Sequence, residues 1–173
     1  FYKDAIRIDS EFSEAYNALG VIYTKEKRWK DALKAFQKAL DNKLYATPHV
    51  PYLNIGDLYM AQQDYAKAIE AYQESKHLVK QDITVYKLGM AFVAAGKTRE
   101  GVVELQEGIA MAPRNVELRL ALGQAYLKDG NKQAALSELR TVVELAPKSD
   151  AAKTARDYIA AIEKVQLQPK TKK

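Results

Sequence analysis

An aliphatic residue followed by glycine recurs along this 173-residue chain at nearly constant intervals. The pairs Leu19-Gly20, Ile55-Gly56, Leu88-Gly89 and Leu122-Gly123 place successive glycines 36, 33 and 34 residues apart. A period of this length is typical of chains built from similar units, none of which can bury its apolar side alone. The feature therefore limits the fold to an array of stacked repeats.

Each unit has the pattern of two amphipathic helices joined by a polar turn. Tyr16, Leu19 and Tyr23 recur at spacings of three and four, which places them on one face of a helix. A second apolar series follows the polar stretch 25–28. We expect glycine and alanine where the two helices cross, and aromatic residues such as Tyr59 in the core.

This arrangement resembles the tetratricopeptide-repeat (TPR) family, whose period is about 34 residues. The family pattern is an aromatic residue, Leu-Gly, Tyr, Ala, a second aromatic residue, Ala and Pro. The matching residues are Tyr16, Leu19-Gly20, Tyr23, Ala32, Phe36 and Ala39 in repeat one; Tyr52, Ile55-Gly56, Tyr59, Ala68 and Tyr72 in repeat two; Leu88-Gly89, Phe92, Leu105 and Pro113 in repeat three; and Leu122-Gly123, Tyr126, Ala135, Leu139 and Pro147 in repeat four. The resemblance implies an all-α fold, a right-handed α-α superhelix of four helix-turn-helix repeats.

The predicted organisation is a single TPR solenoid over residues 1–165. It comprises a partial repeat at 1–10, repeats at 13–46, 49–80, 82–113 and 116–147, and a capping helix at 149–165; a disordered basic tail follows at 166–173. Because the chain begins inside a repeat and without Met, we expect the natural protein to extend upstream, by a signal peptide, a lipid anchor or further repeats. The helix at 1–9 should fray or pack on another molecule.

Local signals add three expectations. Thr47 before Pro48 predicts an N-cap followed by proline at the first helical position. Gly101 and Gly108 replace alanines of the family pattern, which favours closer helix packing over a soft joint in repeat three. Ser149 or Asp150 should cap the last helix, whose apolar stripe comprises Ala152, Ala155, Tyr158, Ile159 and Ile162.

The composition and motifs argue against several classes of function. The absence of cysteine excludes disulfides and cysteine-bound metal. No apolar run approaches the ~20 residues of a membrane span. The net charge is +5, but Lys170, Lys172 and Lys173 supply three of these charges and the rest are interspersed, unlike a nucleic-acid-binding stripe. His49 and His77 are not spaced as a metal pair, and no catalytic motif occurs. We therefore predict no enzyme activity, cofactor or metal.

The concave side, lined by the first helices, is the predicted binding surface for a protein or peptide partner. The inward positions that the TPR resemblance implies, with two neighbouring polar residues, give a candidate groove of Asn17, Val21, Val50, Leu53, Asn54, Asp57, Met60, Ile83, Tyr86, Lys87, Met90, Val93, Leu120, Gln124 and Leu127. Its middle part is apolar, and exposed apolar surface commonly marks an interaction site. The alternatives are closure of the superhelix over this strip, or its burial in a homo-oligomer, which could also form through the N-terminal helix.

One TPR subclass binds the acidic C-terminal peptides of heat-shock chaperones through a clamp of Lys, Asn, Asn, Lys and Arg. In this chain Asn54 matches and Lys87 offers a positive charge. The other three places hold Asn17, Val21 and Ile83, so two donors are replaced by apolar groups. The clamp is incomplete, and the sequence predicts against this function.

A narrower resemblance concerns the junction Leu44-Tyr45-Ala46-Thr47-Pro48 and the following Asn54-Ile55-Gly56. It is similar to that of the type IV pilus biogenesis lipoproteins, or pilotins. The resemblance implies a bacterial protein, periplasmic and anchored to the outer membrane, that assists secretin assembly; without it, the expected compartment is the cytoplasm. Three functions stay open: an interaction module, the non-catalytic TPR segment of a larger enzyme, and a self-assembling structural oligomer.

Overall fold

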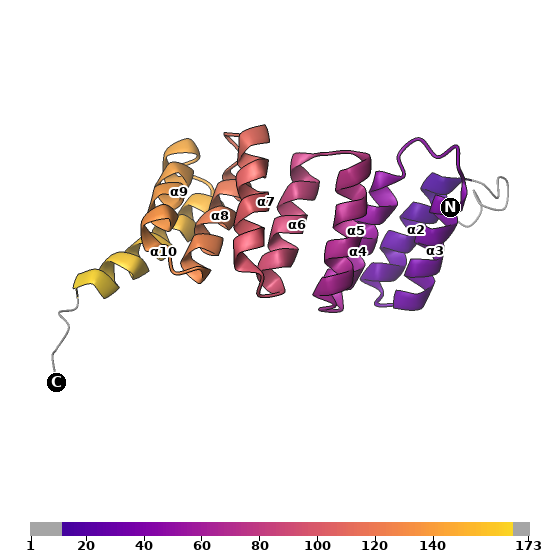
Figure 1. Ribbon diagram of the computed structural model, residues 1–173, viewed down its shortest axis with the longest axis horizontal. Coiled ribbons are helices and arrows are strands. Elements are labelled where there is room, and N and C mark those ends of the chain that lie inside the picture. The colour runs from indigo at the N-terminus through magenta and orange to yellow at the C-terminus, as the bar shows by residue number, and fades with distance from the viewer. Residues whose placement is uncertain (1–11, 168–173) are drawn as a thin grey trace. The chain divides into compact units, whose positions relative to one another are not determined.

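The computed structural model describes residues 12–167, in which all regular secondary structure is helical (Figure 1). The helices are α2 (Ser13–Lys25), α3 (Trp29–Asp41), α4 (His49–Ala61), α5 (Tyr65–Leu78), α6 (Asp82–Ala94), α7 (Thr98–Met111), α8 (Val116–Lys128), α9 (Lys132–Leu145) and α10 (Asp150–Leu167). They group into two compact units that divide after Ala91, within α6. The predicted helix at 1–10 and residues 168–173 of the predicted tail lie outside the described residues.

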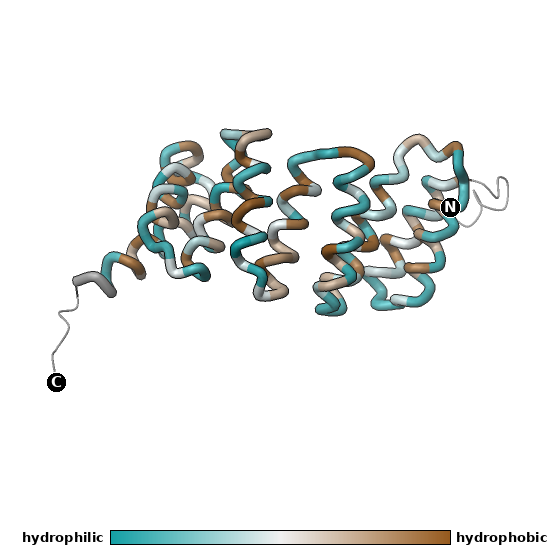
Figure 2. The backbone as a smooth tube through the Cα atoms, viewed as in Figure 1, coloured by the Kyte–Doolittle hydropathy of each residue, from teal (hydrophilic) through white to brown (hydrophobic). Residues whose placement is uncertain are grey.

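Antiparallel helix pairs build each unit, and apolar and hydrophilic residues alternate along the helices (Figures 1 and 2). In the first unit, α2 packs on α3 and α4 on α5, around a buried cluster of Ala32, Phe36, Ile55, Leu58 and Ala71. In the second unit, α9 packs between α8 and α10, around Ala135, Leu136, Leu139, Val142, Ala152, Ala155 and Ile162. The amphipathic patterns of repeats one, two and four thus form the helix pairs predicted from the sequence.

Glycines lie where the helices of a pair cross, as the sequence predicts. A Cβ atom at Gly20 would overlap the ring of Phe36, and one at Gly56 would overlap the ring of Tyr72. At Gly123 the added atom would lie 2.9 Å from Cγ of Leu139. The large side chain of the second helix therefore occupies the space that a side chain on the first helix would need.

The turn inside each repeat has the same geometry in all four repeats. Lys27, Gln63, Gly96 and Gly130 have positive φ angles of 59°, 61°, 80° and 83°. The backbone N–H that follows each of them donates to a carbonyl five residues earlier: Arg28 to Tyr23, Asp64 to Tyr59, Lys97 to Phe92 and Asn131 to Tyr126, at 2.8, 3.0, 2.9 and 2.8 Å. This is the Schellman ending of a helix, in which a left-handed residue lets the chain reverse and satisfies terminal carbonyls.

Gln63→Gly is expected to raise the free energy of unfolding by about 0.5–1 kcal/mol. A residue with a Cβ loses roughly 1–2 kcal/mol in the left-handed conformation, part of which the larger unfolded-state entropy of glycine offsets. Urea unfolding followed by the fluorescence of Trp29, the single tryptophan, measures the change. The control is Gln62→Gly: Gln62 has a φ of −86°, so its substitution should only destabilise. A loss of stability in Gln63→Gly as large as in Gln62→Gly would contradict this account.

The junction before α4 differs from its prediction. The helix begins at His49 after Pro48, one residue later than expected, and no side chain caps it. The carbonyl of Thr47, not its hydroxyl, accepts the first hydrogen bond, from Val50 N at 3.0 Å. Upstream, the side chain of Asn42 accepts from the backbone N–H of Leu44 at 2.9 Å, and this turn leaves Leu44 90% exposed.

Other positions confirm or correct local expectations. The Ser149 hydroxyl caps α10 by accepting from Ala152 N at 3.1 Å, as predicted. Tyr158, predicted in the apolar stripe of α10, is instead 36% exposed. Tyr59, predicted as core, is only half-buried at the edge of the cluster, with the ammonium of Lys67 5.3 Å from its ring centroid.

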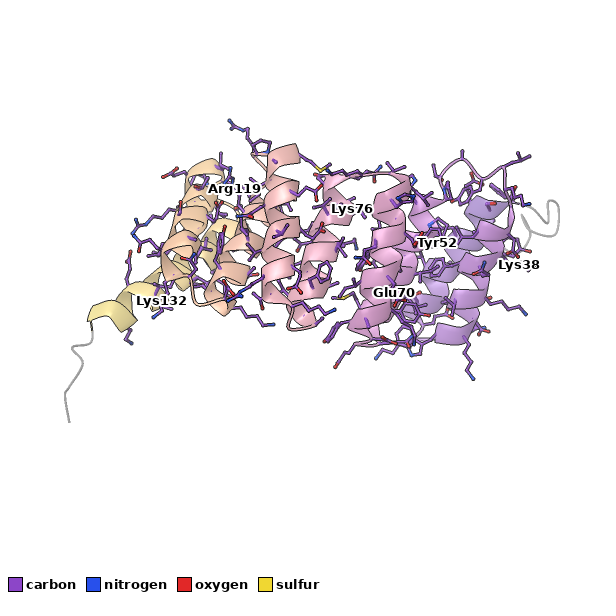
Figure 3. All side chains as sticks on the ribbon, viewed as in Figure 1. Lys38, Tyr52, Glu70, Lys76, Arg119 and Lys132 are labelled. Atoms are coloured by element: carbon purple, nitrogen blue, oxygen red, sulfur yellow. The ribbon has the colours of Figure 1, made fainter. Side chains whose placement is uncertain are left out.

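Two departures from the repeat pattern also have structural counterparts. Gly101 and Gly108 are both buried on α7. Arg119 stands in α8 where the family has an aromatic residue (Figure 3). Its guanidinium contacts Glu138 of α9 at 2.6 Å. In repeat four, an ion pair thus links the two helices at the position that an aromatic side chain otherwise fills.

Candidate interaction surface

The predicted groove residues are carried by the first helix of each repeat, and we call their side of the first unit the first-helix face. It comprises Asn17 and Val21 of α2; Val50, Leu53, Asn54, Asp57 and Met60 of α4; and Ile83, Tyr86, Lys87 and Met90 of α6. Ile83 is 42% exposed, and the other ten residues are half-buried. Apolar side chains that are neither buried nor fully exposed can give up further surface to a partner.

Two amides join α2 to α4 on this face. Nδ2 of Asn54 donates to Oδ1 of Asn17 at 2.9 Å. The contact occupies one polar atom of each side chain and leaves the NH2 group of Asn17 and the carbonyl oxygen of Asn54 outside it. The face therefore begins with a neutral polar link between two successive first helices.

An ion pair joins α4 to α6 farther along the same face. Nζ of Lys87 lies 2.6 Å from Oδ1 and 2.8 Å from Oδ2 of Asp57. The Tyr72 hydroxyl of α5 donates to the same Oδ1 at 2.6 Å. The Asp57 carboxylate is thus held from two helices, and both of its oxygens accept from the lysine.

The environment of Tyr72 keeps its phenol protonated. The residue is only 2% exposed. Its ring packs against Gly56, and its hydroxyl contacts Asp57. Burial, reinforced by the negative charge of Asp57 and the hydrogen bond to it, raises the pKa of Tyr72 above its ordinary value of about 10. The hydroxyl is therefore a donor to Asp57 throughout the neutral range.

This raised pKa predicts a loss of stability in alkali. The contribution of Tyr72 is complete below about pH 10 and declines as the pH rises, because the unfolded chain releases the phenolic proton and the folded chain retains it. The expected slope is about 1.4 kcal/mol per pH unit. Urea unfolding of the wild type and Tyr72→Phe between pH 9 and 11.5 measures it. The difference between the two proteins should shrink with pH, and a constant difference would overturn the assignment.

In the second unit, the candidate residues Val93, Leu120, Gln124 and Leu127 are also half-buried. Leu120 and Leu127 pack against the core cluster of that unit. Gln124 Nε2 lies 3.5 Å from the hydroxyl of Tyr158, and the carbonyl of Val93 accepts from Nζ of Lys128 at 2.5 Å. These contacts give the residues structural roles within the second unit.

The described residues contain no group of His, Cys, Asp or Glu side chains that could hold a metal ion. None of the described helices has the length and apolar character to cross a membrane. Three surface hollows, of about 620, 400 and 280 Å³, lie along α9, along α3 and between α2 and α3, and no residue of the first-helix face lines any of them. The largest is lined by Gln133, Leu136, Ser137, Arg140, Thr141 and Glu144, all from one helix.

Comparison with known protein families agrees with this architecture. Sequence profiles described as tetratricopeptide repeat match residues 13–43, 51–82 and 86–150. The chain belongs to the tetratricopeptide-repeat family. Its fold is accordingly the all-α TPR superhelix, and TPR repeats indicate a protein–protein interaction module.

Solved TPR structures share this fold. The type IV pilus biogenesis factor PilW aligns with a TM-score of 0.82 and 20% identity, over 90% of this chain and 72% of that one. YrrB, described as a TPR protein with an unusual peptide-binding site, aligns with a TM-score of 0.72 and 21% identity, over 98% and 93%. At these identities the likeness concerns the fold.

A curated TPR relative is much longer than this chain. The human intraflagellar transport protein 88 homolog is 25% identical over 134 residues, which cover 74% of this chain but 16% of the relative. The likeness is therefore to one stretch of repeats within a larger protein.

The sequence-based choice of candidate residues missed the polar group that Asp57, Lys87 and Tyr72 form in the first unit. Asp57 and Lys87 were candidates separately, but their pairing across 30 residues and the participation of Tyr72 were not predicted. A signal was present: the position of Tyr72 is held by Phe36, Leu105 and Leu139 in the other repeats. A hydroxyl that occurs at this buried position in only one of the four repeats needs a hydrogen-bond acceptor close to it.

Proposed function

We propose that this TPR protein is a non-catalytic module that binds a peptide or a partner helix on the first-helix face. The observation that carries the proposal is the row of half-exposed apolar side chains on α4 and α6: Val50, Leu53, Met60, Ile83, Tyr86 and Met90. Tyrosine provides a large contact area with few rotatable bonds, and methionine adapts to varied apolar partners.

The surroundings of this row support an interaction role over catalysis. Asp57 and Lys87, which lie on the same two helices as the row, neutralise each other. No nucleophile and general base are brought together on this face among the contacts described above. The TPR identity itself supports binding to protein or peptide partners.

Selection from a library of random 15-residue peptides displayed on phage tests the proposal. We expect the wild type to enrich peptides rich in Leu, Ile, Phe or Met, and enrichment to be lost in the double variant Leu53→Ala/Tyr86→Ala. Val103→Ala is the control, because Val103 is 62% exposed on α7 and does not belong to the face. Peptides that bind the double variant as well as the wild type would place the binding site elsewhere.

A role in type IV pilus or secretin assembly is a narrower proposal, supported by the fold shared with PilW. Complementation of a bacterial strain that lacks its pilotin tests it: restored secretin multimers are the expected result, and none would refute the role. The alternatives are the non-catalytic TPR segment of a larger enzyme, which the gene upstream of Phe1 would reveal, and a homo-oligomer, which the mass in solution would reveal.

A further inference from the structure

Charged side chains are scarce on α4 and α6, the two helices that carry nine of the eleven residues of the first-helix face. Asp57 is the only Asp, Glu, Lys or Arg residue of α4. On α6 the ionised side chains are Asp82, in the first turn, and Lys87. Asp57 and Lys87 therefore dominate the electrostatics of the middle of the face, and their charges sum to zero.

Lys87 is held closely by the Asp57 carboxylate. Its ammonium contacts both carboxylate oxygens of Asp57, within 2.8 Å, and its side chain is only 26% exposed. The Asp57 side chain is 39% exposed, and the hydrogen bond from the Tyr72 hydroxyl fixes its orientation. A ligand carboxylate that approaches Lys87 would meet a like charge within 3 Å of the same ammonium, so it gains little attraction.

We infer that Asp57 is a selectivity-determining residue of this face: by neutralising Lys87 it removes the attraction of the lysine for acidic segments and favours uncharged apolar ones. The inference rests on the proposed function and deepens it. It also gives Tyr72 a defined task, since the buried hydroxyl positions the carboxylate against the lysine.

Substitution of either Asp57 or Lys87 disrupts the ion pair. Asp57→Asn retains an oxygen that can accept from Tyr72 but removes the charge that occupies Lys87. Lys87→Met leaves a half-exposed carboxylate without its cation. The first variant should acquire a preference for acidic peptides and the second for basic ones, whereas the double variant Asp57→Asn/Lys87→Met should retain the selectivity of the wild type.

Phage selection with the same 15-residue random library, run in parallel on the four proteins, tests this. We expect peptides without net charge from the wild type and double variant, acidic peptides from Asp57→Asn, and basic peptides from Lys87→Met. In fluorescence anisotropy, the acidic peptide should bind Asp57→Asn at least tenfold more tightly than the wild type at 50 mM salt. This gain should shrink at 300 mM salt, because salt screens half-exposed charges.

The matched control is Asp64→Asn. Asp64 and Lys67 form an equally short pair, at 2.7 Å, but in the turn after α4 and at the start of α5. Its loss should leave the selected peptides unchanged. If the wild type binds peptides but Asp57→Asn selects peptides of the same charge as the wild type, the inference is overturned and the proposed function still stands. No enrichment from any of the four folded proteins would overturn both, and circular dichroism establishes that each is folded.

Discussion

Phe36→Ala is expected to lower the free energy of unfolding by about 3–5 kcal/mol, the usual cost of truncating a large aromatic residue in a packed core. The Phe36 side chain is completely buried and lies directly against Gly20, the glycine of the first helix crossing. Trp29 packs against the same cluster, so urea unfolding followed by its fluorescence reports on this unit. Val103→Ala, at an exposed site, should change stability by less than about 0.5 kcal/mol.

The crossing itself can be tested by combining substitutions. Gly20→Ala alone should cost about 1–3 kcal/mol, because the new methyl group overlaps the Phe36 ring. In the Phe36→Ala background the same substitution should cost little, since the ring is gone. The two sites then show a coupling free energy, as residues in direct contact do. Additive effects would show that Gly20 is required for a reason other than room for Phe36.

Tyr86→Ala should weaken binding of a selected apolar peptide by about 1–3 kcal/mol, because a few aromatic and apolar anchors usually dominate an interface. It should lower stability far less than Phe36→Ala, since Tyr86 is half-buried in the first unit. Anisotropy titration measures the affinity, and urea unfolding measures the stability.

The control for Tyr86→Ala is Tyr16→Ala. Tyr16 is also half-buried, but it lines the hollow between α2 and α3, outside the first-helix face. Its substitution should leave peptide affinity unchanged. If Tyr86→Ala unfolds the protein as readily as Phe36→Ala, Tyr86 belongs to the core, and the first-helix face loses its principal anchor.

The helix pairs could be predicted from the sequence because their signals are local. Helical spacing of apolar residues and an interval of 33–36 residues between crossing glycines are visible without any structure. The degree of burial was harder to predict, because it depends on helix orientation. Tyr59 and Tyr72 both match the family pattern, yet Tyr72 is buried and Tyr59 is half-exposed beneath Lys67.

The candidate surface was predictable as a set of residues but not as a network. Periodicity assigns Asp57 and Lys87 to first helices, but their contact depends on how one repeat is displaced against the next, and no local pattern records that displacement. The prediction that Thr47 caps α4 was wrong for a related reason. The two additional residues in this junction change the path of the chain, so the helix begins after Pro48 and a backbone carbonyl takes the place of the hydroxyl.

The turn that presents Leu44 to solvent makes the protein unusually convenient for site-specific labelling. The chain has no cysteine, so Leu44→Cys would introduce a single thiol that maleimide dyes reach without competition. The side chain is 90% exposed and the Asn42 side chain holds the adjacent backbone, so a dye attached there should disturb neither helix packing nor the first-helix face. Because the site lies five residues before the start of α4, the dye would accompany the helix that carries Leu53 and Asp57 and could report peptide binding from the protein's side.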